Sequence, residues 1–312
     1  MGLSGSTGPA APRATVVITT KDRCAELREA LPLVLAQTEP VEVLVIDDGS
    51  SDGSAEMVRR EFPQVRVERS ERSLGLIAQR TRAAALASAP IIVSIDDDAR
   101  LVSPRTVAQT LEDFDHDRIG AVAMPFVDVR TTTVVRQLAP DPDGRWVTSS
   151  FIGTAHAVRR DVFLELGGYR DELVQMGEEP ELCLRMLDAG YVTRLGRAEK
   201  LHHLESPKRN TPRIVALGRR NDLLHAFWNV PMPFLPVRLA KVTLHSLWFA
   251  VAWRQPRAVL RGLRSGYRDG LLRRRRRRPV ARATYRLDHE LRKRGPLRLE
   301  DVEPRLPPAR LR

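Results

Sequence analysis

The chain has 312 residues, with 51 Lys and Arg against 39 Asp and Glu, and a formal net charge of +12. A hydrophobic fraction of 42% and a charged fraction of 29% exclude a disordered or fibrous protein and allow a large buried core. The charge is uneven, because residues 235–312 hold 22 basic and 6 acidic residues whereas residues 1–234 hold 29 and 33. The sequence therefore predicts a slightly acidic main part and a strongly basic tail.

Three features bear on the cellular compartment. Residues 1–13 lack the apolar core of a signal peptide, and we expect a flexible leader there. The longest uncharged apolar run near the C-terminus, residues 242–253, is shorter than the roughly 20 residues that a membrane span needs. Cys24 and Cys183 have no metal-ligand spacing, and two cysteines do not form a disulfide framework. Together these features predict a cytoplasmic protein.

Strands and helices alternate in the first half of the sequence. Apolar β-branched runs predict strands at residues 14–19, 41–46, 65–68, 91–95 and 119–124. Helical spacing predicts helices between them, at residues 24–36, 55–60, 76–87 and 104–114. This alternation is typical of an α/β fold whose mainly parallel sheet is covered by helices on both faces.

The second half is less regular. We expect an antiparallel strand at residues 131–135, helices at 161–166 and 178–189, and a strand at 192–195. Prolines at positions 231, 233 and 236 suggest a boundary near residue 230. The predicted organisation is a leader, a domain of residues 14–230 with halves of about 14–125 and 126–230, and a basic amphipathic helical tail of residues 231–312.

Two acidic clusters follow predicted strands, Asp47-Asp48 and the run from Asp96 to Asp98. Ligands bind beyond the carboxyl ends of the strands in such sheets, so both clusters are expected at one rim. Crowded carboxylates favour a hard divalent cation together with phosphate oxygens. Aspartate runs can also simply end strands and cap turns. A calcium loop starting at Asp48 is set aside, because Arg59 stands where a bidentate Glu is required.

The phosphate-loop, dinucleotide, zinc-protease and hydrolase signatures are absent from the sequence. The motifs that are present resemble those of inverting family 2 glycosyltransferases with the GT-A fold. The resemblance covers residues 14–210 and rests on TTKDR at 19–23, VIDDGSSDG at 45–53, SLGLIAQRT at 73–81, SIDDDA at 94–99, GGY at 167–169, GEEPELCLRMLDAGY at 177–191 and HHLESPKR at 202–209.

The resemblance implies a nucleoside-diphosphate sugar as donor, a carbohydrate or lipid-linked acceptor, and Mn²⁺ or Mg²⁺ as cofactor. It implies a metal site at Asp98 and His203, with the neighbouring His202 as the alternative ligand. Lys208 or Arg209 would reach the diphosphate, and a solvated basic loop is the alternative for these two residues. The residues that it implies around the nucleotide sugar are Thr19, Asp22, Arg23, Asp47, Asp48, Arg80, Asp96 and Asp97.

The catalytic base is implied at the start of the helix at 178–189. Relatives carry Glu-Asp there, whereas this chain has Glu178-Glu179. The resemblance therefore points to Glu179, with Glu178 or Glu181 as alternatives. A carboxylate in hydrogen-bond reach can take the proton of an attacking hydroxyl. Acidic residues are also favoured in the first turn of any helix, which is the structural alternative.

The tail combines an apolar helical stripe with many arginines, including six in a row from Arg273 to Arg278. This pattern favours a peripheral position on an anionic membrane surface, at the inner face of the cell membrane. Packing of the tail on the main domain is the alternative, and nucleic-acid binding is disfavoured because no recognisable module accompanies the arginines. Two other functions stay open: a sugar nucleotidyltransferase, although no glycine-rich loop follows the first strand, and a non-catalytic membrane-surface protein.

Overall fold

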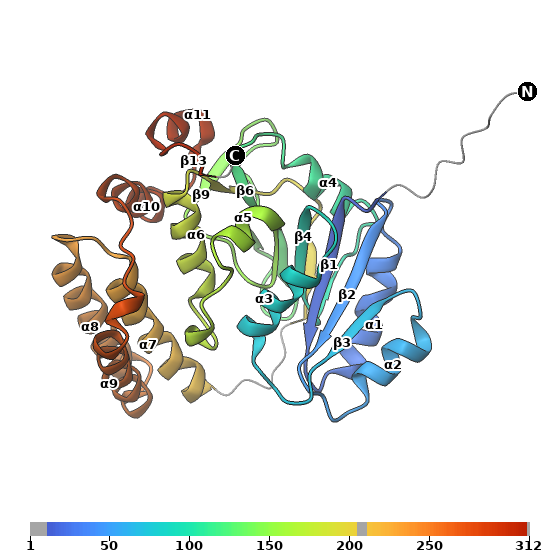
Figure 1. Cartoon of the computed structure of the whole chain (residues 1–312), viewed down its shortest axis with the longest axis horizontal. Coiled ribbons are helices and arrows are strands. Elements are labelled where there is room, and N and C mark those ends of the chain that lie inside the picture. Colours follow the sequence, from blue (N-terminus) through green and yellow to red (C-terminus); the bar gives the residue numbers. More distant parts are fainter. Residues whose placement is uncertain (1–10, 205–210, 311–312) are drawn as a thin grey trace, which may run out of the picture.

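The computed structural model describes residues 11–204 and 211–310, and it centres on a nine-stranded sheet (Figure 1). The strand order is β13-β9-β11-β6-β10-β4-β1-β2-β3. Strands β4, β1, β2 and β3 run parallel, and β10 lies antiparallel between β4 and β6. The strands are β1 (Ala14–Thr20), β2 (Val41–Asp47), β3 (Arg66–Arg69), β4 (Ile91–Asp96), β6 (Ile119–Ala123), β9 (Trp146–Thr148), β10 (Ala155–Arg159), β11 (Val192–Leu195) and β13 (Leu297–Arg298).

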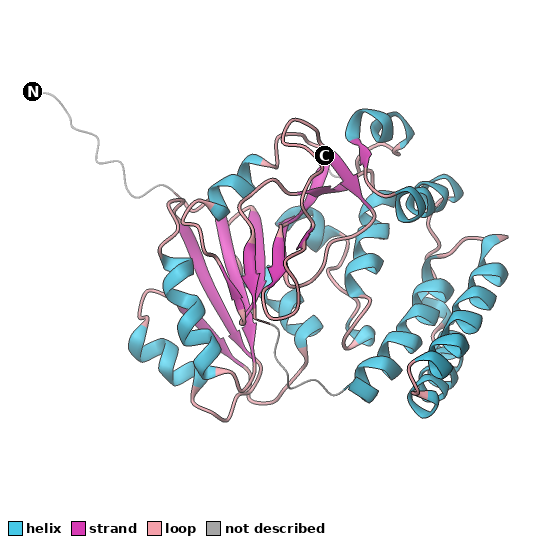
Figure 2. Ribbon diagram, turned by 180° about the vertical axis from the view of Figure 1, so that it is seen from behind, coloured by secondary structure: helices cyan, strands magenta, loops and turns pink. Residues whose placement is uncertain are grey.

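Helices cover both faces of this sheet, so the expected mainly parallel α/β architecture is confirmed (Figure 2). The core on one face contains apolar residues of α1 (Cys24–Leu35), α2 (Ser54–Glu61) and α4 (Thr106–Glu112). The core on the other face contains those of α3 (Leu76–Leu86), α5 (Arg160–Glu165) and α6 (Glu178–Asp188). The predicted strand and helix positions of the first half agree with these elements to within two residues at most boundaries.

A second, four-stranded sheet has the order β5-β12-β7-β8. Its strands are β5 (Ala99–Arg100), β12 (Leu201–His203), β7 (Phe126–Asp128) and β8 (Val135–Arg136). The antiparallel strand expected at residues 131–135 is wrong in extent, because Thr131 and Thr132 donate their N–H groups to the Asp128 carbonyl and form a turn. This small sheet pairs the residues just after β4 with residues much later in the chain.

The C-terminal region forms a helical bundle and then returns to the main sheet. The bundle consists of α7 (Thr211–Asn229), α8 (Phe234–Ala252) and α9 (Pro256–Leu272), followed by η2 (Arg274–Arg276) and α10 (Arg282–Arg294). Strand β13 pairs with β9, and Leu287, Leu291, Leu299 and Val302 join the main core. The short elements α11 (Leu299–Val302) and η3 (Glu303–Arg305) follow, and η1 (Asp171–Leu173) precedes α6.

The tail is therefore not helical throughout, and its last part closes one edge of the sheet. The sequence pattern of the tail did not predict this pairing, because the strand that forms it, β13, has only two residues. Within the described ranges, no helix combines the length and the hydropathy that crossing a bilayer requires.

Candidate active site

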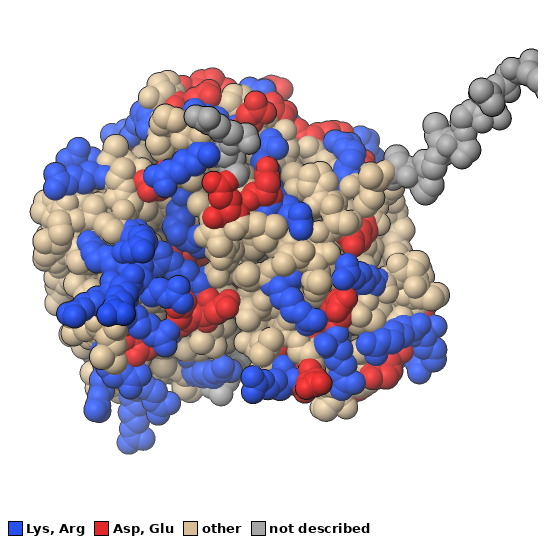
Figure 3. Space-filling view, viewed as in Figure 1, with Lys and Arg blue, Asp and Glu red and all other residues tan. Residues whose placement is uncertain are grey.

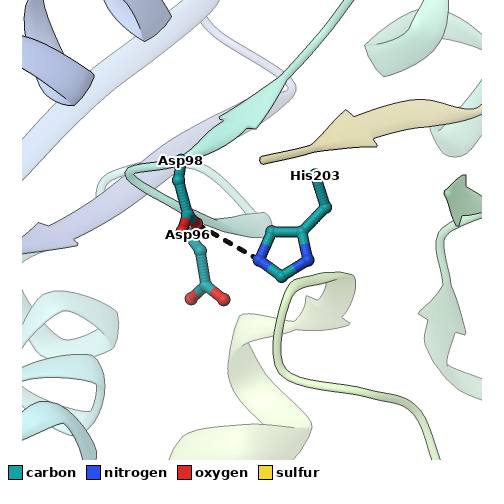
Figure 4. Close-up of side chains that lie close together, drawn as sticks. All are labelled: Asp96, Asp98 and His203. Carbon is teal, nitrogen blue, oxygen red and sulfur yellow. Dashed lines mark ion pairs between the residues drawn. The ribbon is translucent and has the colours of Figure 1, made fainter. Parts of the chain in front are cut away.

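The run of aspartates lies where β4 ends and the small sheet begins. Asp96 is the last residue of β4, and Asp97 and Asp98 form the turn into β5. Because β12 pairs with β5, with His203 opposite Ala99, the imidazole of His203 is brought to this turn. Figure 4 shows the ring pointing at Asp98 from the facing strand. Asp96, Asp98 and His203 each offer one ligand atom, and these atoms all lie within 4.8 Å of one another.

His203 is held between two carboxylates. Its Nδ1 lies 2.5 Å from Asp128 Oδ1 and its Nε2 lies 3.3 Å from Asp98 Oδ1. Burial lowers the pKa of His203, but hydrogen bonding to Asp98 and Asp128 outweighs it and raises the pKa to about 9. A carboxylate on one ring nitrogen is the usual way to orient a metal-ligating imidazole. His202 projects from the opposite side of β12 and is not part of this group.

Arg23 neutralises part of the same turn. Its Nη1 lies 2.8 Å from Asp97 Oδ1 and its Nη2 lies 2.8 Å from Asp98 Oδ2. Thr20 donates its hydroxyl to the other oxygen of Asp97, at 2.8 Å. Burial raises the pKa of Asp97 to about 7, against the effect of Arg23. Burial acts in the same direction on Asp98, but His203 and Arg23 overcome it and hold the pKa of Asp98 below its ordinary value.

The other acidic cluster is used inside the protein. Buried Asp48 accepts hydrogen bonds from Ser73 Oγ at 2.6 Å, Leu74 N at 2.7 Å, Gly75 N at 3.0 Å and Gln79 Nε2 at 2.7 Å. Burial raises the pKa of this carboxyl, but these donors outweigh it and lower the pKa below its ordinary value. Asp48 therefore fixes the loop that leads into α3.

The remaining predicted nucleotide residues are close to this loop. Buried Asp47 accepts a hydrogen bond from Ser50 N at 2.8 Å, and Asp22 accepts one from Ser51 N at 2.7 Å. The hydroxyl of Thr19 is buried and has no hydrogen-bond partner among the described residues. Thr19 Oγ1 and Asp47 Oδ2 are thus the two buried polar atoms of this set that have no hydrogen-bond partner among the described residues.

Helix α6 begins at Glu178, directly after Gly177 with φ of +82°. Glu179 is partly buried, and its Oε1 accepts a hydrogen bond from Gly153 N at 3.0 Å. Glu178 is buried, and its Oε2 has no hydrogen-bond partner among the described residues. Burial raises the pKa of Glu178 to about 8 and also raises that of Glu179.

Arg80 of α3 connects the two carboxylate groups. Its Nη2 lies 2.7 Å from Asp96 Oδ1 and donates to the Gly153 carbonyl at 2.8 Å, and its Nη1 lies 4.0 Å from Glu178 Oε1. A Cβ at Gly153 would lie 2.6 Å from Glu179 Oε1 and 2.7 Å from Arg80 Nη1, so a larger residue there would displace both side chains. The guanidinium is buried and bonded to Asp96 and Gly153, and its contact with the donor stays a prediction.

Glu181 is enclosed by basic side chains. It is fully buried, and its oxygens lie 2.9 Å from Arg170 Nε and 2.7 Å from Arg185 Nη2, with Asn229 Nδ2 donating at 3.3 Å. A carboxylate held in this way packs α6 against α7. Its oxygens are occupied by these partners, which favours Glu178 and Glu179 over Glu181 as the base.

Two residues of the site, Asp128 and Gly153, were not predicted from the sequence. Asp128 falls where the strand pattern loosens, and its partner is 75 residues away, so no local signal marks it. Gly153 is identified only by what surrounds it in space. Lys208 and Arg209 lie outside the described residues.

Comparison with known proteins gives consistent results. Residues 15–168 match the family model described as Glycosyl transferase family 2. Succinoglycan biosynthesis protein ExoU of Rhizobium meliloti is 29% identical over 196 residues, which cover 56% of this chain and 57% of that protein. Glucosyl-dolichyl phosphate glucuronosyltransferase of Haloferax volcanii is 28% identical over 208 residues, which cover 56% of this chain and 64% of that protein. The chain thus spans less than two thirds of the length of either relative.

A solved structure supports the same fold. Mannosyltransferase PcManGT from Pyrobaculum calidifontis, in complex with GDP-Man and Mn²⁺, superposes with a TM-score of 0.58 at 23% identity. The match covers 83% of this chain and 76% of that chain. This likeness concerns the arrangement of strands and helices. Together with the family match, it shows that residues 15–168 belong to glycosyl transferase family 2 and that the chain has the GT-A fold.

Proposed function

We propose that the chain is an inverting glycosyltransferase that moves a sugar from a nucleoside-diphosphate sugar to an acceptor hydroxyl. The observation that carries this is the pairing of two carboxylate groups across buried Arg80. One is the Asp96, Asp98 and His203 group, and the other is Glu178 and Glu179. Donor activation and proton abstraction need these two kinds of group within one site.

The residues at the aspartate turn fit a divalent cation. Two carboxylates and one imidazole offer the oxygen and nitrogen donors that suit Mn²⁺, and carboxylates alone would suit Mg²⁺. Asp98 and His203 would hold the cation, with Asp96 beside them and Asp128 orienting the imidazole. Such a cation supplies positive charge that stabilises the leaving diphosphate. PcManGT was solved in complex with GDP-Man and Mn²⁺, which supports this choice.

The acceptor side is assigned to Glu179. Gly153 N fixes its Oε1, and its Oε2 takes the acceptor proton as the hydroxyl attacks the anomeric carbon. The bond to the diphosphate breaks as the new glycosidic bond forms, so one displacement inverts the configuration. Buried Glu178 stays beside Arg80 and keeps its place as the alternative base.

The acceptor is assigned to carbohydrates or lipid-linked sugars. Both relatives are named for polysaccharide or lipid-linked sugar chemistry, succinoglycan in one and glucosyl-dolichyl phosphate in the other. We place the chain in cell-envelope polysaccharide or glycolipid synthesis, peripherally bound at the inner face of the cell membrane. The sugar nucleotidyltransferase alternative gains no support, because both relatives and the matched family carry other names.

A donor-hydrolysis assay tests this proposal. The wild-type chain is incubated with GDP- and UDP-sugars, with Mn²⁺ or with EDTA, and free nucleoside diphosphate is measured. We expect release with Mn²⁺ and loss with EDTA. Asp98→Asn should lose at least about 100-fold in rate, whereas exposed Asp117→Asn should match wild type. The proposal would be contradicted if the chain formed a nucleotide sugar from a nucleoside triphosphate and a sugar phosphate. Equal rates of donor hydrolysis for both variants would also contradict it.

A transfer assay tests the base. Glu179→Gln should lower transfer about 100- to 10,000-fold, the usual contribution of a general base, while donor binding is kept. Glu178→Gln serves as the matched neighbour. If Glu178→Gln lowers transfer more than Glu179→Gln, the proton acceptor is the buried residue.

A further inference from the structure

Helix α8 presents a row of apolar side chains to solvent. Its members are between 42% and 81% exposed. Those from Leu244 onward recur at intervals of three and four residues, and Val237 lies two turns before Leu244, so all of them lie along one side of the helix. The buried residues of α8, Val242, Ser246 and Ala250, lie on its opposite side and face the bundle. We define the α8 stripe as Val237, Leu244, Leu247, Trp248 and Val251. Exposed apolar rows of this length mark an interaction surface.

Helix α9 carries a row of arginines with the same kind of spacing. We define the α9 stripe as Arg257, Arg261, Arg264 and Arg268. Its members are exposed, and of the four only Arg268 has an ion pair among the described residues, with Asp269. A surface hollow of about 450 Å³ lies along this stripe, lined by Leu260, Arg261, Arg264, Ser265 and Arg268. Unpaired guanidinium groups around an open hollow suit phosphate oxygens.

The two stripes belong to one side of the bundle. Gly262, Gly266 and Gly270 of α9 pack against α7, and at 100° per residue the arginines project away from that contact. Helices α8 and α9 meet at Thr243 and Tyr267, whose hydroxyl oxygens lie 2.7 Å apart. Each stripe therefore lies beside the α8–α9 contact and turns away from α7. Figure 3 shows Lys and Arg gathered over the part of the molecule where η2 and α9 lie.

We propose that the α8 and α9 stripes form a docking surface for an anionic phospholipid bilayer. The α8 stripe would enter the boundary between headgroups and acyl chains, and the α9 stripe would bind lipid phosphates. Trp248 suits this boundary, because an indole ring is apolar with one polar edge. A second copy of the chain fits the surface less well, because the two basic tails would repel each other. The inference rests on the proposed function in one respect: docking on a bilayer would place the transferase beside a lipid-linked acceptor.

Vesicle flotation with the full chain tests this surface. Wild type is mixed with vesicles of phosphatidylcholine alone or with about 30% phosphatidylglycerol, at low and at high salt. We expect binding only to the anionic vesicles, weakening as salt rises. Val251→Asp should reduce binding at least about tenfold, because a carboxylate then enters the apolar boundary. Val134→Asp, at a similarly exposed valine far along the chain from the bundle, should bind like wild type.

A second pair of variants tests the charges. Arg261→Gln with Arg264→Gln should weaken binding about fivefold per arginine and flatten the salt dependence. Arg59→Gln with Arg60→Gln removes the same charge from exposed positions on α2 and should leave binding unchanged. The proposal would be overturned if both pairs of variants lost vesicle binding equally, or if wild type bound neutral vesicles. It would also be overturned if light scattering showed dimers that Val251→Asp converts to monomers, or if the chain retained a nucleic-acid oligomer in place of vesicles. Donor hydrolysis should be the same in all these variants, so its failure and that of docking are separable.

Discussion

Arg80 offers the sharpest test of how the two carboxylate groups are held together. The substitution Arg80→Gln removes a guanidinium whose side chain is 4% exposed and which lies 2.7 Å from Asp96 and 4.0 Å from Glu178. It also removes the hydrogen bond to the Gly153 carbonyl. Removing one partner of a buried ion pair costs about 3–5 kcal/mol of unfolding free energy, because the remaining charge has no compensation.

The cost should depend on pH. Burial raises the pKa of Asp96 and of Glu178, in Glu178 to about 8, and Arg80 acts against this rise. Without Arg80 both pKa values rise further. A carboxyl whose pKa is higher in the folded than in the unfolded state loses stability as pH increases between the two values. Below its folded pKa of about 8, Glu178 is protonated with or without Arg80, so its part of the deficit of Arg80→Gln appears only above that pH, and the deficit should be largest near pH 9. At pH 5 it should fall to about 1–2 kcal/mol, the cost of the lost hydrogen bond.

Urea unfolding in EDTA at pH 5 and pH 9 measures this deficit. Arg82→Gln is the matched control, because Arg82 lies on the same helix and its side chain is 35% exposed. Its hydrogen bonds go to Ser70 and Glu68 near the surface, so its loss should stay within about 1 kcal/mol at both pH values. A deficit of Arg80→Gln below about 1 kcal/mol at pH 9, or one equal at both pH values, would refute the reasoning.

Three further predictions concern the bundle and the metal group. In urea unfolding, Gly262→Ala should lower the unfolding free energy by about 1–3 kcal/mol, because its Cβ would lie 2.5 Å from the Ala216 carbonyl oxygen. Gly218→Ala has open space around it and should raise the unfolding free energy by up to about 1 kcal/mol. His203→Asn should weaken Mn²⁺ binding in calorimetry at least about tenfold, and equal loss in His202→Asn would contradict the assignment of His203. Asp128→Asn should weaken Mn²⁺ binding about 10- to 100-fold, and unchanged affinity would show that Asp128 does not orient the ring.

The first half of the fold follows from local sequence signals. The β-branched runs at residues 14–19 and 91–95 became β1 and β4, and the alternation with helices predicted parallel pairing correctly. Strands β5, β12 and β13 were missed because each has only two or three residues. Such strands are defined by partners distant in sequence, and no periodicity reveals them.

For the candidate site too, local features were predictable from the sequence and contacts between distant residues were not. The aspartate run and the Glu178-Glu179 pair were identified from motifs, because strand ends and helix starts are local features. The sequence did not reveal that Asp48 accepts four hydrogen bonds within the chain. The four donors come from the loop before α3 and from α3 itself. The choice between His202 and His203 also needed the structure, since only the side of β12 decides which ring faces Asp98.

The arginines explain how this chain tolerates so many carboxylates in one place. Asp98 shares its two oxygens between His203 and Arg23, and Asp96 is paired with Arg80. Each acidic group thus already has a cationic partner from the chain, so the cluster can fold without a bound ion. A divalent cation at Asp98 would have to replace one of these partners rather than fill an uncompensated site. Cation binding at this turn would therefore be an exchange of partners, in which His203 changes from the ion-pair partner of Asp98 to a second ligand and Arg23 competes for the same carboxylate.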